Sequence, residues 1–505
     1  MENNPSLGVS GSDVISLPSK FLTRHGLIAG STGTGKSRTM QVLAEQLSEN
    51  GSSVFVSDVK GDASGFCVAG QENERNKLAD YRPRGIQANY WSIGDRFAPI
   101  RFSVSSIGPV LISRLLCLNP TQESHLALAF SYARKEKKPL FELDQLLDIL
   151  DEMVETNQRG MSKSSVSVIQ RKIIALDESG VGGLFGKPSL SLGDLKGLNV
   201  LNLSNSRKDM TVAIAPAFLL QMLFDSLPEV GNVDAPKFAI FFDEAHYLFK
   251  DANKSLQNRM VTILKQIRSK GVSVFFVTQD VTDLPDEILS QLSTKIIFSQ
   301  KVFTQKGNKR LKALANSFPR SEMDVLETLK RMPPGVAVVS TLDSSGNQTE
   351  PKEVRMFAPA TTMDIVPDEV LIQSTDEELI RKYREREKFP EKAAPAKAPE
   401  KTAKAEKEKP ARLEKPAKEG RQPKKKSGPS IWSGIFGFLL KLLDFILKAF
   451  GKLFSFLIFR PGKKYFKWMM KKKVRILYTL VFILILYIIM VNRGLIEGFL
   501  GALKF

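Results

Sequence analysis

Cysteine and histidine are scarce in this chain. Its 505 residues include two cysteines, Cys67 and Cys117, and three histidines. The cysteines are 50 positions apart and form no CxxC pair, which argues against a zinc site or a disulfide framework. The first residues show no basic segment followed by an apolar one, so we expect no signal peptide. A reduced, cytoplasmic body is therefore expected.

The first 390 residues carry almost no net positive charge. The net charge is +19, but residues 391–505 contain 26 Lys+Arg against 8 Asp+Glu, which leaves 47 basic and 46 acidic residues for 1–390. The basicity therefore belongs to the C-terminal part. The near-neutral body lacks the overall positive field that is usual for a protein that binds double-stranded DNA.

Short apolar runs alternate with helical patterns through the body. A segment at about 106–180 has several helical patterns without comparable strands and is interpreted as a helical insertion. Two runs at 335–342 and 352–357 flank Ser-Ser-Gly-Asn and predict a hairpin. The alternation predicts an α/β fold with a doubly wound sheet. The other strands are expected at 26–29, 53–57, 199–203, 238–242, 272–278 and 295–299.

A phosphate-binding loop follows the first of these buried runs. It consists of Gly30, Ser31, Thr32, Gly33, Thr34, Gly35, Lys36 and Ser37, which match G-x-x-x-x-G-K-S between a strand and a helix. The three glycines permit backbone N–H groups to turn toward phosphate oxygens. Lys36 would neutralise the β- and γ-phosphates, and the Ser37 hydroxyl would bind Mg²⁺. The motif predicts a P-loop NTPase with ATP and Mg²⁺.

Two acids end the apolar run at 238–242. Asp243 is expected to hold the metal through water, and Glu244 to polarise the attacking water. Gln279 ends the next run, where it would hold the lytic water or sense the γ-phosphate. A surface amide is the alternative for Gln279.

Four ordered segments resemble one family. They are RHGLIAGSTGTGKS, VFVSDVKGD, FFDEAHYLF and IRSKGVSVFFVTQ, and they are similar to the HerA-like branch of the HerA/FtsK ATPases. The resemblance implies a RecA-type domain over residues 1–360, a ring that is a homo-hexamer with ATP between subunits, and often DNA translocation. It also places Asp62 beside the nucleotide, although a loop cap is an equal alternative. In ring ATPases a neighbouring subunit commonly supplies an arginine, for which Arg171 and Arg268 are the candidates.

The C-terminal part predicts attachment to a membrane. A charged helix is expected in 361–390, and residues 391–430, of which 25 of 40 are Ala, Lys or Pro, predict a disordered linker. Residues 431–459 predict an amphipathic helix on anionic lipid, with a second membrane crossing or an oligomer contact as alternatives. Residues 474–491 predict a single transmembrane helix. Seven basic residues at 463–475 would keep the ATPase body in the cytoplasm.

The leading hypothesis is a membrane-anchored ring ATPase that acts on an unidentified polymer or partner, DNA or protein. A slow nucleotide-gated membrane scaffold is one alternative. A membrane-tethered translocase of double-stranded DNA, with the 391–430 linker touching phosphates, is another.

Overall fold

The computed structural model describes residues 4–205, 209–250, 253–301 and 305–385. The strands are β1 Ser6–Ser10, β2 Asp13–Ser16, β3 Gly26–Ala29, β4 Ser53–Asp58, β5 Ala88–Ser92, β6 Ala98–Pro99, β7 Leu198–Asn202, β8 Phe238–Phe242, β9 Val272–Thr278, β10 Thr294–Phe298, β11 Val336–Ser340 and β12 Lys352–Met356. The helices are α1 Lys36–Glu49, α2 Val104–Leu115, α3 Pro120–Lys135, α4 Leu143–Glu155, α5 Lys163–Glu178, α6 Asp209–Ser226, α7 His246–Lys250, α8 Lys254–Gln266, α9 Asp286–Leu289, α10 Gln305–Ala315, α11 Val325–Arg331, α12 Asp368–Ser374 and α13 Glu377–Arg384.

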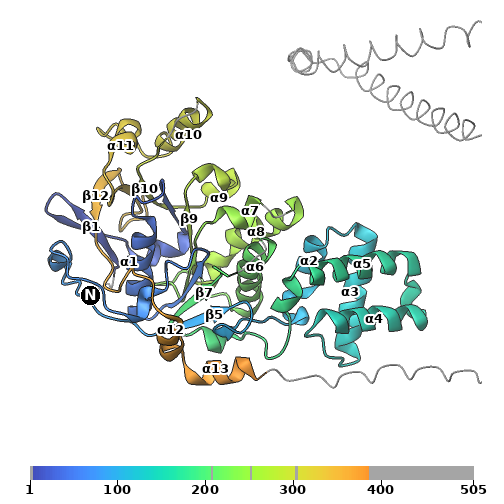
Figure 1. Cartoon of the computed structure of the whole chain (residues 1–505). Helices are drawn as coiled ribbons and strands as arrows, with labels where there is room; N and C mark the ends of the chain where they lie inside the picture. Colours follow the sequence, from blue (N-terminus) through green and yellow to red (C-terminus); the bar gives the residue numbers. More distant parts are fainter. Residues whose placement is uncertain (1–3, 206–208, 251–252, 302–304, 386–505) are drawn as a thin grey trace, which may run out of the picture. The chain divides into compact units, whose positions relative to one another are not determined.

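All the strands of these described ranges form one mixed, mostly parallel sheet (Figure 1). The order is β2-β1-β12-β11-β10-β3-β9-β8-β4-β7-β5-β6, and the strands from β10 to β6 in that order are parallel. The four strands at the other end pair antiparallel. Because β3, β9, β8 and β4 are parallel neighbours, their carboxyl ends meet at one edge of the sheet. The chain segments that follow these four strands contain the predicted site residues other than Arg171 and Arg268.

Two apolar clusters cover the two faces of the sheet. In β9, Val274 and Phe276 belong to one cluster, while Phe275 and Val277 belong to the other. This alternation is the two-residue period of a strand that is buried on both faces. Apolar residues of α1 and α12 complete one cluster, and those of α6, α8 and α2 to α5 complete the other. The α/β prediction is therefore confirmed, and the sheet is large, mixed and mostly parallel.

Helices α2 to α5 form a group of their own beside the sheet (Figure 1). Helix α3 begins at Pro120, and Asn119 caps it by accepting a hydrogen bond from the Gln122 backbone N–H, while the Gln122 side chain accepts one from the Asn119 N–H. Such a reciprocal cap contributes about 1 kcal/mol. The group joins the core through α2, which contacts α6 and α8.

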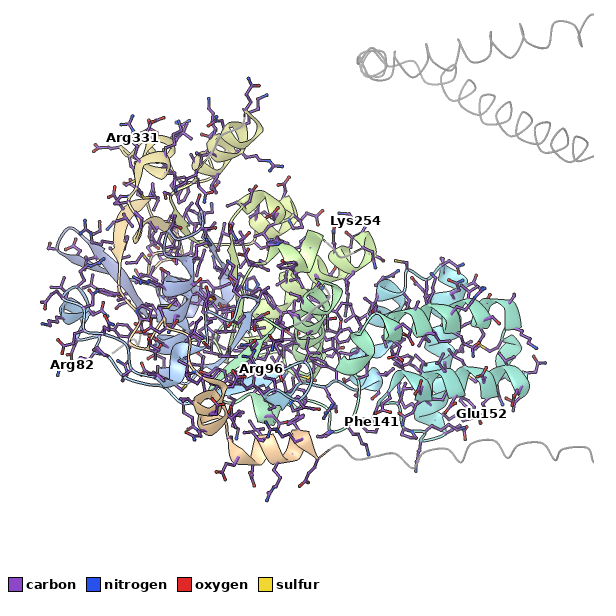
Figure 2. The ribbon with its side chains drawn as sticks, viewed as in Figure 1. Arg82, Arg96, Phe141, Glu152, Lys254 and Arg331 are labelled. Carbon is purple, nitrogen blue, oxygen red and sulfur yellow. The ribbon has the colours of Figure 1, made fainter. Side chains whose placement is uncertain are left out.

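The segment 361–385 contains two short helices where a single charged helix was expected. The break between α12 and α13 has a physical cause: the Ser374 and Thr375 hydroxyls accept hydrogen bonds from the β5 backbone N–H groups of Ala88 and Tyr90, each at 3.1 Å. Arg96, labelled in Figure 2, holds α12 through two hydrogen bonds of 2.7 Å to Asp368. Residues 386–390, the 391–430 linker, the 431–459 helix and the 474–491 helix lie outside the described residues. Among residues 4–205, 209–250, 253–301 and 305–385, no helix combines the length and apolar character that a membrane crossing requires.

Candidate functional site

The predicted phosphate loop connects β3 to α1. Its backbone has a positive φ at Gly33, 76°, and at Gly35, 123°. Residues other than glycine rarely adopt such values. A Cβ at Gly30 would lie 2.5 Å from the Cβ of Phe298, so the loop packs against β10 at a position where only glycine fits. The Thr34 hydroxyl donates a 2.7 Å hydrogen bond to the Ser31 carbonyl and braces the loop from within.

Lys36 is buried at the start of α1 and reaches back over the loop. Its Nζ donates a 3.0 Å hydrogen bond to the Ser31 carbonyl. Burial and the neighbouring Lys60 lower the pKa of Lys36, against the opposing effect of Glu244 and Asp243. An ammonium group that is held in a desolvated loop is placed to bind a polyanion.

A cavity of about 560 Å³ opens over this loop. Four cationic side chains lie on its wall: Lys36, Arg38, Lys60 and Arg75. The cavity volume is in the range of small-molecule sites. Its lining residues are Thr32, Gly33, Thr34, Gly35, Lys36, Ser37, Arg38, Lys60, Asp62, Asn73, Arg75, Pro334, Gly335, Met356, Phe357, Ala358 and Met363.

Three carboxyl groups converge next to the loop, at the ends of β4 and β8. Asp58, Asp62 and Asp243 place one oxygen each within 4.8 Å of one another. Ser37 Oγ lies 3.4 Å from Asp62 Oδ2, which joins the predicted metal ligand of the loop to this group. Asp243 Oδ2 and Asp62 Oδ1 are buried and accept no hydrogen bond from the described residues.

This chemistry fits a divalent cation. Burial and the charge of Asp62 raise the pKa of Asp58 to about 7, and burial with the charges of Asp58 and Glu244 raises that of Asp243 to about 7. A bound cation would compensate the buried negative charge and use the unpartnered oxygens. The residues that would hold Mg²⁺ are therefore Ser37 and Asp243, with Asp62 beside them.

Glu244 lies on a tight turn at the tip of β8. The turn is fixed on both sides, because the Asp243 N–H donates to the Ser57 carbonyl and the Ala245 N–H donates to the Val277 carbonyl. Glu244 itself has a φ of 46°, which is uncommon for a residue with a side chain and is found at functional sites. The turn directs its carboxylate toward the ends of the neighbouring strands β4 and β9.

Two side chains hold the Glu244 carboxylate. Lys60 Nζ forms an ion pair with its Oε1, and Gln279 Nε2 donates a hydrogen bond to the same oxygen. Burial would raise the pKa of Glu244, but these hydrogen bonds outweigh it and hold the pKa below its ordinary value. His246 Nδ1 lies 3.2 Å from the other oxygen. Glu244 is thus an ionised carboxylate that is able to accept a proton.

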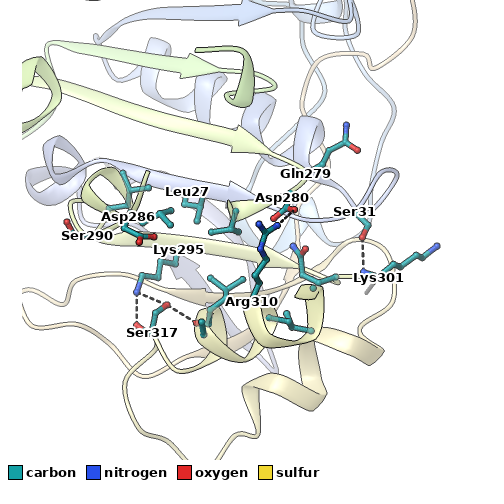
Figure 3. Close-up of a pocket in the computed structure, with 18 of the residues that line it drawn as sticks. Leu27, Ser31, Gln279, Asp280, Asp286, Ser290, Lys295, Lys301, Arg310 and Ser317 are labelled. Carbon is teal, nitrogen blue, oxygen red and sulfur yellow. Dashed lines mark hydrogen bonds and ion pairs between the residues drawn. The ribbon is translucent and has the colours of Figure 1, made fainter. Parts of the chain in front are cut away.

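Gln279 links the phosphate loop to Glu244. Its Oε1 accepts a 2.8 Å hydrogen bond from the Thr32 hydroxyl, while its Nε2 donates to Glu244. A second cavity, of about 1260 Å³, adjoins the loop at Ser31 and Thr32. Figure 3 shows this cavity, with the ion pair of Arg310 and Asp280 near Gln279. The amide of Gln279 therefore lies in the site and is not a loose surface group.

The two arginine candidates lie away from this cluster. Arg171 is exposed on α5, where its Nε donates to the Ser167 carbonyl, and Figure 1 shows α5 in the separate helical group. Arg268 lies on the turn Ile267–Lys270, before β9, whereas Gln279 follows the other end of β9. A seven-residue strand is about 23 Å long. Neither arginine is placed to reach its own chain's phosphate loop.

The site also contains residues that were assigned no role from sequence. Asp58 accepts hydrogen bonds from the N–H groups of Gly61 and Ala63 and so shapes the loop that presents Lys60. Both stand in the VFVSDVKGD segment, so a strand-end signal was present for them. Arg75 and the cavity walls at 334–335 and 356–358 stand in no motif, and tertiary folding alone brings them to the loop.

The chain matches the family described as "Helicase HerA-like C-terminal" over residues 8–431. It is 27% identical over 344 residues to the DNA double-strand break repair helicase HerA of Sulfurisphaera tokodaii, covering 65% of each chain. It is 25% identical over 325 residues to the protein of that name from Saccharolobus solfataricus, covering 63% of this chain and 61% of the relative. The chain thus spans less than two thirds of the length of these relatives.

Solved structures with a similar fold include VirB4 of Thermoanaerobacter pseudethanolicus, with a TM-score of 0.48, 15% identity, and coverage of 70% of this chain and 96% of VirB4. The bacterial conjugative coupling protein TrwB gives a TM-score of 0.49 at 14% identity, with coverage of 72% and 92%. Because the family match extends over residues 8–431, well over half of the chain, this protein belongs to the helicase HerA-like C-terminal family and is a HerA-like P-loop ATPase.

Proposed function

We propose that this RecA-type domain hydrolyses Mg·ATP in the cavity over the phosphate loop and uses the reaction to move a polymer or partner. The observation that most supports this is that Lys36, Lys60 and Asp62 line one cavity. Asp243 lies against Asp62, and Glu244 is paired with Lys60. Lys36 would bind the β- and γ-phosphates, and backbone N–H groups of the loop would hold the others. The bound Mg²⁺ would neutralise charge on the β- and γ-phosphate oxygens.

Glu244 would act as the general base. Its carboxylate accepts a proton from water as the water oxygen bonds to the γ-phosphorus, and the bond from that phosphorus to the β–γ bridging oxygen breaks to release ADP. Gln279 would hold the attacking water, because its amide already lies between Thr32 of the phosphate loop and Glu244. General base catalysis of this kind contributes about 10²- to 10⁴-fold in rate.

We further propose that the active form is a ring, a homo-hexamer in the leading hypothesis, in which a neighbour supplies the arginine. Arg171 and Arg268 are the candidates, because neither lies at the phosphate loop of its own chain. An arginine supplied by a neighbour contributes about 10³- to 10⁵-fold in related phosphoryl-transfer enzymes.

The relatives named as DNA double-strand break repair helicases favour double-stranded DNA as the polymer. The near-neutral balance of residues 1–390 favours a protein partner instead. ATP hydrolysis by the full-length protein, measured with and without double-stranded DNA at two salt concentrations, separates these hypotheses. Strong stimulation that weakens with salt supports a DNA translocase. A slow, unstimulated rate supports a nucleotide-gated scaffold.

We also propose that the protein is anchored in a membrane by residues 474–491, with 431–459 on anionic lipid and the ATPase body in the cytoplasm. The support is the uncharged run at 476–491 and the seven basic residues that precede it at 463–475.

A further inference from the structure

Lys60 lies between the proposed catalytic base and the nucleotide cavity. It pairs with Glu244 Oε1, and it also lines the cavity that contains Lys36 and Ser37. Its side chain is 40% exposed, whereas that of Glu244 is 5% exposed. The lysine can therefore change its partner without unfolding its surroundings, while the carboxylate stays where its turn holds it.

The loop that presents Lys60 is firmly built. Asp58, fully buried, accepts hydrogen bonds of 2.7 Å from the Gly61 N–H and 3.1 Å from the Ala63 N–H. Gly61 has a φ of 81°, a conformation that suits glycine. The backbone under Lys60 is thus fixed, and its four-carbon side chain supplies the movement.

One oxygen of the Glu244 carboxylate is occupied in this arrangement, because Oε1 is bound by both Lys60 and Gln279. The other, Oε2, is buried, accepts no hydrogen bond from the described residues and lies 3.2 Å from His246 Nδ1. A γ-phosphate that enters the cavity brings oxyanions that compete with Glu244 for the Lys60 ammonium group. Loss of the Lys60 contact would leave Glu244 with Gln279 and free to bind water.

We propose that Lys60 is a positioning residue that exchanges Glu244 for the γ-phosphate, so that the base is released only when a nucleoside triphosphate is bound. This inference rests on the proposed function of the same site. It predicts that Lys60 recognises the γ-phosphate and that Glu244 opposes its binding, because the two compete for one ammonium group.

The test is a double-mutant cycle on nucleotide affinity with the full-length protein. The dissociation constants of ADP and of a non-hydrolysable ATP analogue, both with Mg²⁺, are measured for the wild type, Lys60→Met, Glu244→Gln and the double variant. ADP lacks the γ-phosphate, so its affinity should change by less than twofold throughout. Glu244→Gln should lower the dissociation constant of the ATP analogue at least fivefold, and Lys60→Met should raise it at least tenfold. In the double variant the gain from Glu244→Gln should disappear.

Two controls separate this role from a structural one. Lys60→Arg keeps a charged donor and should retain the preference for the analogue over ADP within about threefold. Lys330→Met removes a similarly exposed lysine from an ion pair with Glu327 on α11, and should change neither affinity. The inference is overturned if Glu244→Gln still increases the affinity for the analogue in the Lys60→Met background. It is also overturned if Lys60→Met keeps the wild-type preference for the analogue over ADP. Wild-type protein that binds neither nucleotide overturns the proposed function as well.

Discussion

His25 gives the fold a specific sensitivity to acid. It is fully buried before β3, where its Nδ1 accepts a 3.1 Å hydrogen bond from the Val274 N–H and its Nε2 lies 3.0 Å from the Leu264 carbonyl. The neutral ring with the proton on Nε2 satisfies both contacts. A second proton on Nδ1 would face the Val274 N–H. Burial lowers the pKa of His25 from 6.5 to about 4, with Arg268 adding to the effect.

The unfolded chain therefore binds more protons than the folded one between pH 6.5 and 4. The stability that the fold has with a neutral His25 is fully present above pH 6.5, and it is lost as the pH falls toward 4. With a difference of about 2.5 pKa units and about 1.36 kcal/mol per unit, the free energy of unfolding should fall by about 2.5 kcal/mol between pH 7 and 4.5 from this residue alone.

The variant that isolates this effect is His25→Asn, because asparagine tolerates the φ of 59° at this position. Urea unfolding of the wild type and the variant is measured from pH 7.5 to 4.5, and the free energy of unfolding of one is subtracted from that of the other. The two proteins share their carboxylates, so the titration of those groups cancels in the difference. The variant should be less stable at pH 7, and the difference should shrink by about 2.5 kcal/mol toward pH 4.5. A difference that stays constant with pH would refute the buried neutral histidine.

Three other outcomes are expected. Mixing Lys36→Ala subunits with Arg268→Ala subunits should restore part of the ATPase activity, because some mixed interfaces join an intact phosphate loop to an intact Arg268. No restoration in any ratio would exclude Arg268 as the arginine supplied by a neighbour. Asp243→Asn should raise the Tm of the magnesium-free protein at pH 8, because burial raises the pKa of Asp243 to about 7 and the ionised carboxylate opposes folding at that pH. A lowered Tm would contradict the presence of a destabilising buried charge at this position. The full-length protein should remain with vesicles after alkaline carbonate, whereas deletion of 431–505 should abolish flotation, and extraction of the intact chain by carbonate would exclude a transmembrane anchor.

The sequence predicted the parts of the fold in which local pattern and burial agree. Strands β3, β8 and β9 are continuous apolar runs that lie at the centre of the sheet, so both faces are buried and the pattern is unambiguous. Strands β1, β2, β5 and β6 were missed. They contain polar or small residues that interrupt an apolar run, and β1 gains its place by pairing with β12, 348 positions away at Gly8 and Met356. Such distant pairing leaves no local signal.

The site divides in the same way. Gly30 to Ser37, Asp243 and Glu244 belong to motifs in which each residue type has one chemical role, and the structure brings them to one edge of the sheet. The contacts of Lys60 with Glu244 and of Thr32 with Gln279 depend on the order of β3, β9, β8 and β4 in the sheet, which the sequence does not state. The role of an arginine from another subunit depends on assembly and stays a prediction.

The most direct test of the central claim is a comparison of Lys36→Ala and Glu244→Gln for both nucleotide binding and phosphate release from Mg·ATP. If the cavity over the phosphate loop is the catalytic site, Lys36→Ala should lose productive binding, whereas Glu244→Gln should bind ATP and release phosphate at least about 100-fold more slowly than the wild type. Glu244→Gln that binds Mg·ATP and hydrolyses it at the wild-type rate would contradict the account.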